Sequence, residues 1–180
     1  CGPVQLLKVK TLHVDVEQNY FSEILNWLFG AVPALETVVF GEISKSRAKA
    51  LSRIFRKYCP YLRTVKQTSV YKNFNRTPPQ TTGAAYLVGA CAPGSLVHAS
   101  LDSSRIGSRL MEALSMHRDS LGTLELTISD ADYLDSFKKL GTILEQYSRL
   151  KHLTVYFYVS TCDLQQPSVF LDKLALCQGL

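Results

Sequence analysis

The chain has 180 residues, of which 46% are hydrophobic, and a formal net charge of +5. A hydrophobic fraction this high excludes a disordered chain, and no apolar run is long enough to indicate a membrane span. The first residues lack the basic start and long apolar segment of a signal peptide. We therefore expect a cytoplasmic or nuclear protein without membrane contact. Because it begins with Cys1 and ends on apolar residues, we expect it to be a piece of a longer chain.

A six-residue pattern, apolar-x-x-apolar-x-apolar, recurs along the chain. Its copies begin at Val9, Leu35, Leu62, Leu96, Leu121 and Leu150. The central apolar residues of successive copies are separated by 26, 27, 34, 25 and 29 residues. A period of this length indicates one supersecondary unit stacked on itself, because each unit is too small to bury its own apolar face.

Each copy predicts a short strand, and the stretches between the copies predict helices. Apolar residues recur at helical spacing near 21–28, 51–58, 110–114, 137–147 and 170–176. The second of these helices should end at Cys59-Pro60. Alternating strands and helices predict a parallel sheet, because parallel strands need a crossover and a helix usually provides it. An ordinary doubly wound sheet would also alternate, but the uniform strand pattern favours a stacked array.

Equivalent positions of the copies should face the same way, because side chains alternate along a strand. The predicted buried ladder is Leu12, Val38, Val65, Ala99, Leu124 and Leu153. The predicted exposed row, with Arg63, His98 and His152 as its neighbours, is His13, Val39, Lys66, Ser100, Glu125 and Thr154. We expect these exposed residues to bind a partner.

The third interval is longer than the others. Residues 68–94 contain Asn, Pro, Thr and Gly residues typical of turns and loops. An insertion of this kind in a stacked array often belongs to a binding surface, although a mobile loop without a role fits the composition equally well.

The repeated pattern resembles the leucine-rich repeat superfamily, in particular its ribonuclease-inhibitor-like and F-box-associated repeats. The entry Cys59-Pro60-Tyr61-Leu62 is similar to the strand entry of F-box-associated repeats, whereas the turn Asn or Cys of the family is missing from most copies. The resemblance implies a single α/β solenoid domain over residues 1–180, with about six irregular repeats, a parallel sheet on one face and helices on the other. It also implies a non-catalytic protein-interaction module without a cofactor. In an F-box protein this module would be the substrate-recognition part of a ubiquitin ligase receptor, and the F-box itself would lie outside these residues.

The positive charge is concentrated in one part of the chain. Residues 43–101 contain ten basic and no acidic residues. One helical face there carries Lys45, Lys49, Arg53, Arg56 and Lys57, without acidic partners at helical spacing. A solvated outer face is the simplest interpretation. The alternative is an adaptor in a larger assembly that contacts nucleic acid or another polyanion through residues 45–76.

The motifs of common enzymes are missing from the sequence. It contains neither a glycine-rich phosphate-binding motif nor a G-x-S-x-G nucleophile motif. Of the histidines in the strands, His98 and His152 should be two strands apart, too far to share a zinc ion, and His13 should be in another row. The five cysteines are widely spaced, which favours buried free thiols. We therefore expect no metal site and no enzyme, with catalysis on an ordinary α/β fold as the other alternative.

Overall fold

The computed structural model describes residues 6–14, 21–41, 43–68, 83–103, 106–128 and 133–157 of the chain. Within these ranges, strands and helices alternate along the sequence from a first strand to a last strand. None of the helices there combines the length and the apolar character that a membrane crossing requires.

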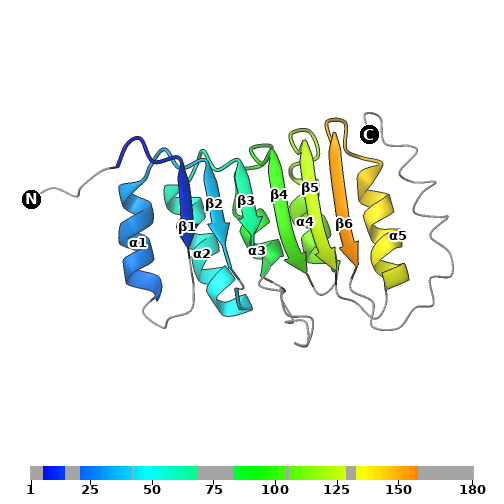
Figure 1. Cartoon of the computed structure of the whole chain (residues 1–180), viewed down its shortest axis with the longest axis horizontal. Coiled ribbons are helices and arrows are strands. Elements are labelled where there is room, and N and C mark those ends of the chain that lie inside the picture. Colours follow the sequence, from blue (N-terminus) through cyan, green and yellow to red (C-terminus); the bar gives the residue numbers. More distant parts are fainter. Residues whose placement is uncertain are drawn as a thin grey trace, which may run out of the picture.

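The described residues form one sheet of six parallel strands. The strands are β1 (Thr11–Val14), β2 (Thr37–Phe40), β3 (Thr64–Gln67), β4 (His98–Ser103), β5 (Thr123–Ile128) and β6 (His152–Phe157). Their order in the sheet is their order in the sequence (Figure 1). The prediction of a parallel sheet with one strand for each copy of the pattern is confirmed.

The helices form a row beside the sheet. They are α1 (Phe21–Ala31), α2 (Lys45–Tyr58), α3 (Ala84–Val88), α4 (Ser108–Ser115) and α5 (Tyr133–Leu144). Helices α2, α3 and α4 lie on one face of the sheet, and α1 and α5 continue the row at its two ends, so that each helix contacts the next (Figure 1). Four of the five predicted helices are confirmed, and the stretch 170–176 lies outside the described residues.

Helix α2 has recognisable signals at both ends. Its N-cap residue is Ser44, whose Oγ accepts a hydrogen bond from the Arg47 backbone N–H at 3.4 Å. At the other end the Cys59 N–H donates to the Phe55 carbonyl at 2.9 Å. Pro60 follows directly and cannot continue the helix. The predicted end at Cys59-Pro60 is confirmed.

Helix α3 lies within residues 68–94, whose composition indicated turns and loops and for which no helix was predicted. It is only five residues long, too short to show a helical period in the sequence. A Cβ at Gly83 would lie 3.1 Å from the Ala48 Cβ and 3.2 Å from the Ile43 carbonyl oxygen, so glycine allows the close approach of α3 to α2. The other predicted loop residues, 69–82, lie outside the described residues.

The register of the strands places the predicted ladder in one line. Leu12, Val38, Val65, Ala99, Leu124 and Leu153 are successive partners across the sheet. The four central members are fully buried, which confirms the prediction for them. Leu12 and Leu153 are only partly buried because they lie on the two edge strands, each of which has a neighbour on one side only.

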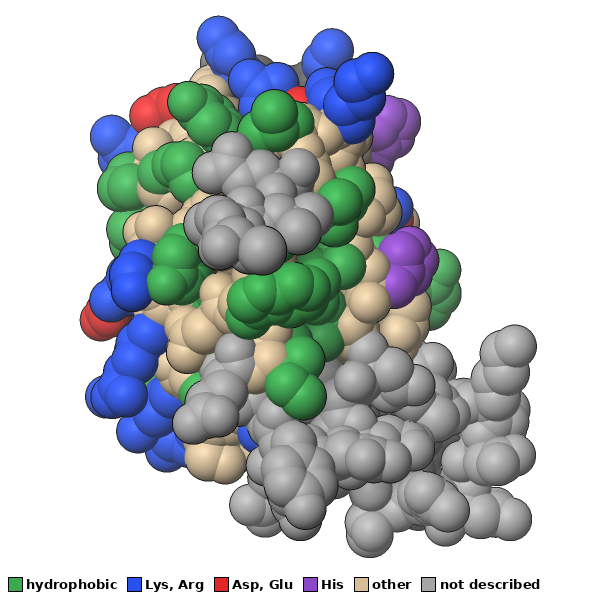
Figure 2. All heavy atoms as spheres, turned by 90° about the vertical axis from the view of Figure 1, so that its left-hand side faces the viewer, with side chains coloured by type: hydrophobic (Ala, Val, Ile, Leu, Met, Phe, Trp, Pro, Cys, Tyr) green, Lys and Arg blue, Asp and Glu red, His purple; other side chains and the backbone are tan. Residues whose placement is uncertain are grey.

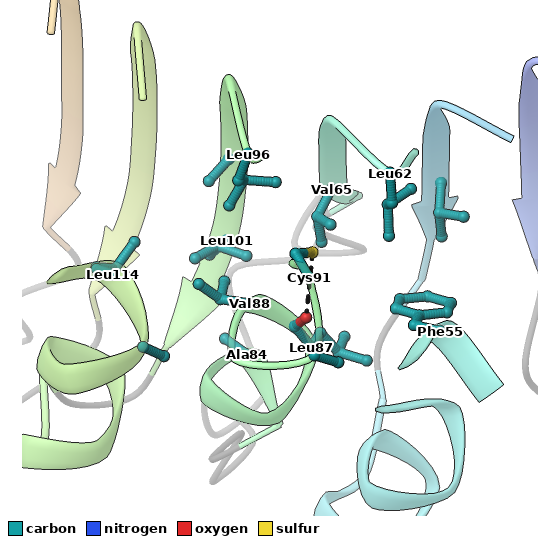
Figure 3. Close-up of a cluster of buried hydrophobic side chains, with 14 of the residues drawn as sticks. Phe55, Leu62, Val65, Ala84, Leu87, Val88, Cys91, Leu96, Leu101 and Leu114 are labelled. Atoms are coloured by element: carbon teal, nitrogen blue, oxygen red, sulfur yellow. Dashed lines mark hydrogen bonds between the residues drawn. The ribbon is translucent and has the colours of Figure 1, made fainter. Parts of the chain in front are cut away.

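The core lies between the sheet and the helices. Figure 3 shows Val65 and Leu101 from the strands opposite Phe55 and Leu87 from the helices. Cys91 lies in the same cluster, and its Sγ donates to the Leu87 carbonyl at 3.5 Å.

Cys59 and Cys91 are both buried and free, as predicted for the cysteines in general. Burial raises the pKa of each thiol to about 12, so both remain protonated at neutral pH. The other cysteines, Cys1, Cys162 and Cys177, lie outside the described residues.

Gln67 replaces an apolar residue at the end of the third copy of the pattern. It is buried, and its side-chain Oε1 accepts a hydrogen bond from the Asp102 backbone N–H at 3.2 Å. Backbone N–H and C=O groups that are buried at the end of a strand need a hydrogen-bond partner. The Gln67 side chain does this for the next strand, β4.

Candidate functional site

The face of the sheet opposite α2, α3 and α4, here called the open face, presents two rows of outward side chains. The threonine row is Thr11, Thr37, Thr64, His98, Thr123 and His152. The central row is His13, Val39, Lys66, Ser100, Glu125 and Thr154. The central row is the row predicted from the sequence, and its alignment across the strands is confirmed.

Val39 corrects one part of that prediction, because its side chain is buried with only 9% of its area exposed. In the register, Val39 lies between His13 of β1 and Lys66 of β3. Its short side chain is flanked by two longer ones, which take the exposed area. The other members of the central row are exposed or half-buried.

His98, Lys66 and Glu125 form the charged centre of the open face. The His98 Nε2 lies 3.6 Å from the Glu125 Oε1, which is too long for a hydrogen bond, and this nitrogen has no partner among the described residues. Partial burial, followed by the positive charge of Lys66, lowers the pKa of His98, and Glu125 opposes this shift only in part. His98 is therefore neutral at pH 7, and its contact with Glu125 is not an ion pair under these conditions.

The residues that enter the strands extend this surface at one edge. The strand-entry row is Lys10, Glu36, Arg63, Val97, Gly122 and Lys151. Each backbone N–H of this row, from Glu36 onward, donates to the backbone carbonyl of the preceding member at 2.8–2.9 Å.

The strand-entry row also contains an ion pair, in which the Lys10 Nζ lies 2.7 Å from the Glu36 Oε1. This hydrogen bond and the charges of Lys10 and Arg63 lower the pKa of Glu36. Arg63, predicted as a neighbour of the exposed row, is exposed here.

The histidines of the strands lie in the rows predicted from the sequence. His98 and His152 lie in the threonine row with Thr123 of β5 between them. His13 lies in the central row, three strands away from His98. Among the described residues, no three His, Cys, Asp or Glu side chains lie close enough together to hold a metal ion.

The basic residues predicted on α2 lie on the helical side of the molecule. Lys45, Lys49, Arg53, Arg56 and Lys57 are all exposed there. In Figure 2, which views the molecule from the α1 end, Lys and Arg side chains gather along the left edge, where the helices lie. The Arg56 Nη2 donates to the Gly89 carbonyl at 3.1 Å, and the Lys57 Nζ lies 4.7 Å from the centre of the Tyr58 ring.

Tyr86 of α3 connects this face with α4, a contact that sequence reasoning missed. The Lys49 Nζ lies 5.4 Å from the centre of its ring, and the Arg109 guanidinium carbon lies 5.6 Å from it. Arg109 also donates from Nη1 to the Tyr86 hydroxyl oxygen. Since α3 belongs to the stretch predicted as loop, no periodicity placed Tyr86 next to these two cations.

The α1 end of the molecule exposes apolar side chains (Figure 2). Ile24 and Trp27 of α1 are 60% and 62% exposed, and Leu6 and Leu7, which precede β1, are also exposed. In the described chain, no strand lies beyond β1 to cover this end.

Comparison of the sequence with protein-family models and with curated proteins gave no match.

Proposed function

We propose that the chain is a non-catalytic protein-interaction module that holds a protein partner on the open face. The observation that carries this proposal is the open face itself: two rows of side chains, aligned across all six strands and left uncovered by the helices of the described chain. Strands held by their neighbours present these side chains with little freedom. Binding to such a rigid surface loses little conformational entropy.

The sequential strand order and the helices gathered on one side of the sheet support a solenoid of the leucine-rich repeat type. A doubly wound sheet instead reverses its strand order and has helices on both faces. The finer proposal, an F-box-associated module that selects the substrate of a ubiquitin ligase, rests on the resemblance of the strand entry Cys59-Pro60-Tyr61-Leu62.

The size of the open face limits how tightly it alone could bind. Six strands spaced about 4.8 Å apart span about 24 Å. Three strands have four residues and three have six, so their mean length is about 16.5 Å. This face, about 400 Å² as a flat area, is smaller than the roughly 800 Å² that each partner buries in a stable complex. A tight partner must therefore also contact residues beyond the open face, whereas a transient partner could bind to it alone.

Charge reversal on the open face tests the proposal. Lys66→Glu and Glu125→Lys invert the charges at its centre without adding or removing a buried group, because both side chains are partly exposed. Quantitative affinity purification from cell extract, with the wild type and each variant as bait, should identify proteins that lose about tenfold or more of their binding.

Lys138→Glu is the matched control, since Lys138 is exposed on α5. The bound proteins should be unaffected by this change. If the same proteins bind equally well to the wild type and to both open-face variants, the open face is not the binding surface.

A second candidate function, an adaptor that contacts nucleic acid through residues 45–76, is favoured by one observation. Among the described residues, Lys45, Lys49 and Arg53 form no ion pair with a carboxylate. Binding of duplex DNA that weakens steeply with salt would support this function.

A further inference from the structure

The helical side of the molecule carries a compact group of cations that is separate from the open face. Four of them come from α2 and one from α4: Lys45, Lys49, Arg53, Arg56 and Arg109, here called the helix-side cluster. The four from α2 lie on one side of that helix because they are spaced three or four residues apart. The helices α2, α3 and α4 together carry seven basic residues and one acidic residue, Glu112.

Tyr86 holds two members of the cluster near each other. The distances to its ring centre, 5.4 Å for Lys49 and 5.6 Å for Arg109, place the two charges at most about 11 Å apart. The hydrogen bond to the Tyr86 hydroxyl fixes the Arg109 guanidinium further. Arg56 is likewise fixed by its bond to the Gly89 carbonyl. Side chains that are already ordered lose less entropy when they bind an anion.

The like charges of the cluster are not neutralised within the described chain. Residues 43–101 contain no acidic residue, and the described ion pairs lie elsewhere. Glu112, three residues after Arg109 on α4, forms no ion pair there. Such a cluster favours an acidic ligand, and it raises the rate at which one associates.

We propose that the helix-side cluster binds a short acidic segment of a partner protein. The pair Lys49 and Arg109 favours this ligand over a nucleic acid. These two charges lie at most about 11 Å apart, a distance over which a duplex presents only a few phosphates, and affinity for nucleic acid depends on the number of phosphates neutralised. A short run of carboxylates can bring its charges together within this distance, and guanidinium groups bind carboxylates with two hydrogen bonds.

The ring of Tyr86 supports the same choice. Its hydroxyl is engaged by Arg109, and both cations lie over the ring. It therefore does not offer the free aromatic surface on which the bases of a single strand stack. Since the cluster and the open face lie on opposite sides of the sheet, the module could hold an acidic segment and a second partner together.

A labelled peptide consisting of a short run of glutamates tests the proposal, with the same run of glutamines as the uncharged control. Fluorescence anisotropy should show that the wild type binds the glutamate peptide and not the glutamine peptide. In the double variant Lys49→Gln, Arg109→Gln, the Kd should rise about tenfold or more, because charge-assisted hydrogen bonds are lost. Tyr86→Phe retains the ring and removes the oxygen that orients Arg109, so it should weaken binding by a smaller factor.

The matched control is the double variant Lys138→Gln, Arg149→Gln, which removes one lysine and one arginine charge from exposed positions elsewhere. Its Kd should stay within about twofold of the wild-type value, because exposed charges farther away than about 10 Å are screened. Circular dichroism should show that all variants fold like the wild type, since the substituted residues lie at the surface.

Three results would overturn the proposal: no binding of the glutamate peptide by the wild type, equal loss of binding in the two double variants, or tighter binding of a short duplex DNA than of the peptide. In the last case the Kd for DNA would rise steeply between about 50 and 200 mM salt, and the cluster would be a nucleic-acid site.

Discussion

His117 shows how a single buried polar residue can join two parts of the chain. It is fully buried, and its Nδ1 accepts a hydrogen bond from the Leu96 backbone N–H at 3.4 Å. Its Nε2 lies 3.2 Å from the Val88 carbonyl oxygen, to which only a protonated Nε2 can donate. Together, the two hydrogen bonds require that His117 is neutral and carries its proton on Nε2. Burial lowers the pKa of His117, and the bond to Val88 opposes this only in part.

The lowered pKa of His117 predicts a stability that depends on pH. In the unfolded chain His117 becomes protonated near pH 6.5, whereas in the folded chain it becomes protonated only at a lower pH. The free energy of unfolding should therefore be greatest above about pH 6.5 and decrease as the pH falls below that value. Urea denaturation at several pH values measures this slope. His117→Gln, which keeps a side-chain N–H donor, should flatten it.

Part of the pH dependence of the free energy of unfolding should remain in the His117→Gln protein, because the pKa of His98 is lowered as well. A His117→Gln protein with the full wild-type slope would show that His117 is not the group that titrates.

At the scale of the element, the parallel strands are held by the ladder of apolar residues beneath them. Leu124 of β5 lies between Ala99 of β4 and Leu153 of β6 and is completely buried. Leu12 occupies the equivalent position in the edge strand β1 and is only partly buried. The same residue type at the same point of the unit therefore differs in burial only through its neighbours.

This difference predicts unequal costs for two identical substitutions. Leu124→Ala should lower the free energy of unfolding by about 2–5 kcal/mol, because it removes buried methyl groups and leaves a cavity. Leu12→Ala should cost clearly less, since its side chain is already partly exposed and solvent can reach the space that is left. Denaturant titration of both variants measures the two values. A cost below about 1 kcal/mol for Leu124→Ala would contradict the central burial of this ladder.

At the scale of the whole molecule, a helix lies beside each edge strand, α1 beside β1 and α5 beside β6 (Figure 1). At the β1 end, the exposed Ile24 and Trp27 of α1 leave an apolar surface. Large exposed apolar side chains that lie together are uncommon on a monomeric protein surface, which makes this end the most informative one to probe in solution.

Trp27 provides that probe because it is the only tryptophan of the chain. With 62% of its area exposed, it should emit at the long wavelength of hydrated indole and be quenched readily by acrylamide. Steady-state fluorescence at several protein concentrations makes the measurement. Trp27→Phe is the control, since its signal should vanish at the tryptophan wavelength. A blue-shifted emission that resists the quencher would mean that this end is covered in solution.

The amino-acid sequence by itself determined the six parallel strands, their register and four of the helices. It could do so because a repeated apolar pattern and side-chain alternation are local properties: the spacing from Val38 to Val65 already aligns β2 with β3. The basic face of α2 was predicted in the same way, from helical spacing alone.

Only the tertiary structure decided which of these residues meet. Val39 was expected to be exposed and is buried, because its exposure depends on the lengths of His13 and Lys66 in the adjacent strands. The helix α3 is too short to have a period, and the contacts of Tyr86 with Lys49 and Arg109 join residues far apart in the sequence. Such contacts arise from the packing of one unit on the next, which no pattern within a single unit records.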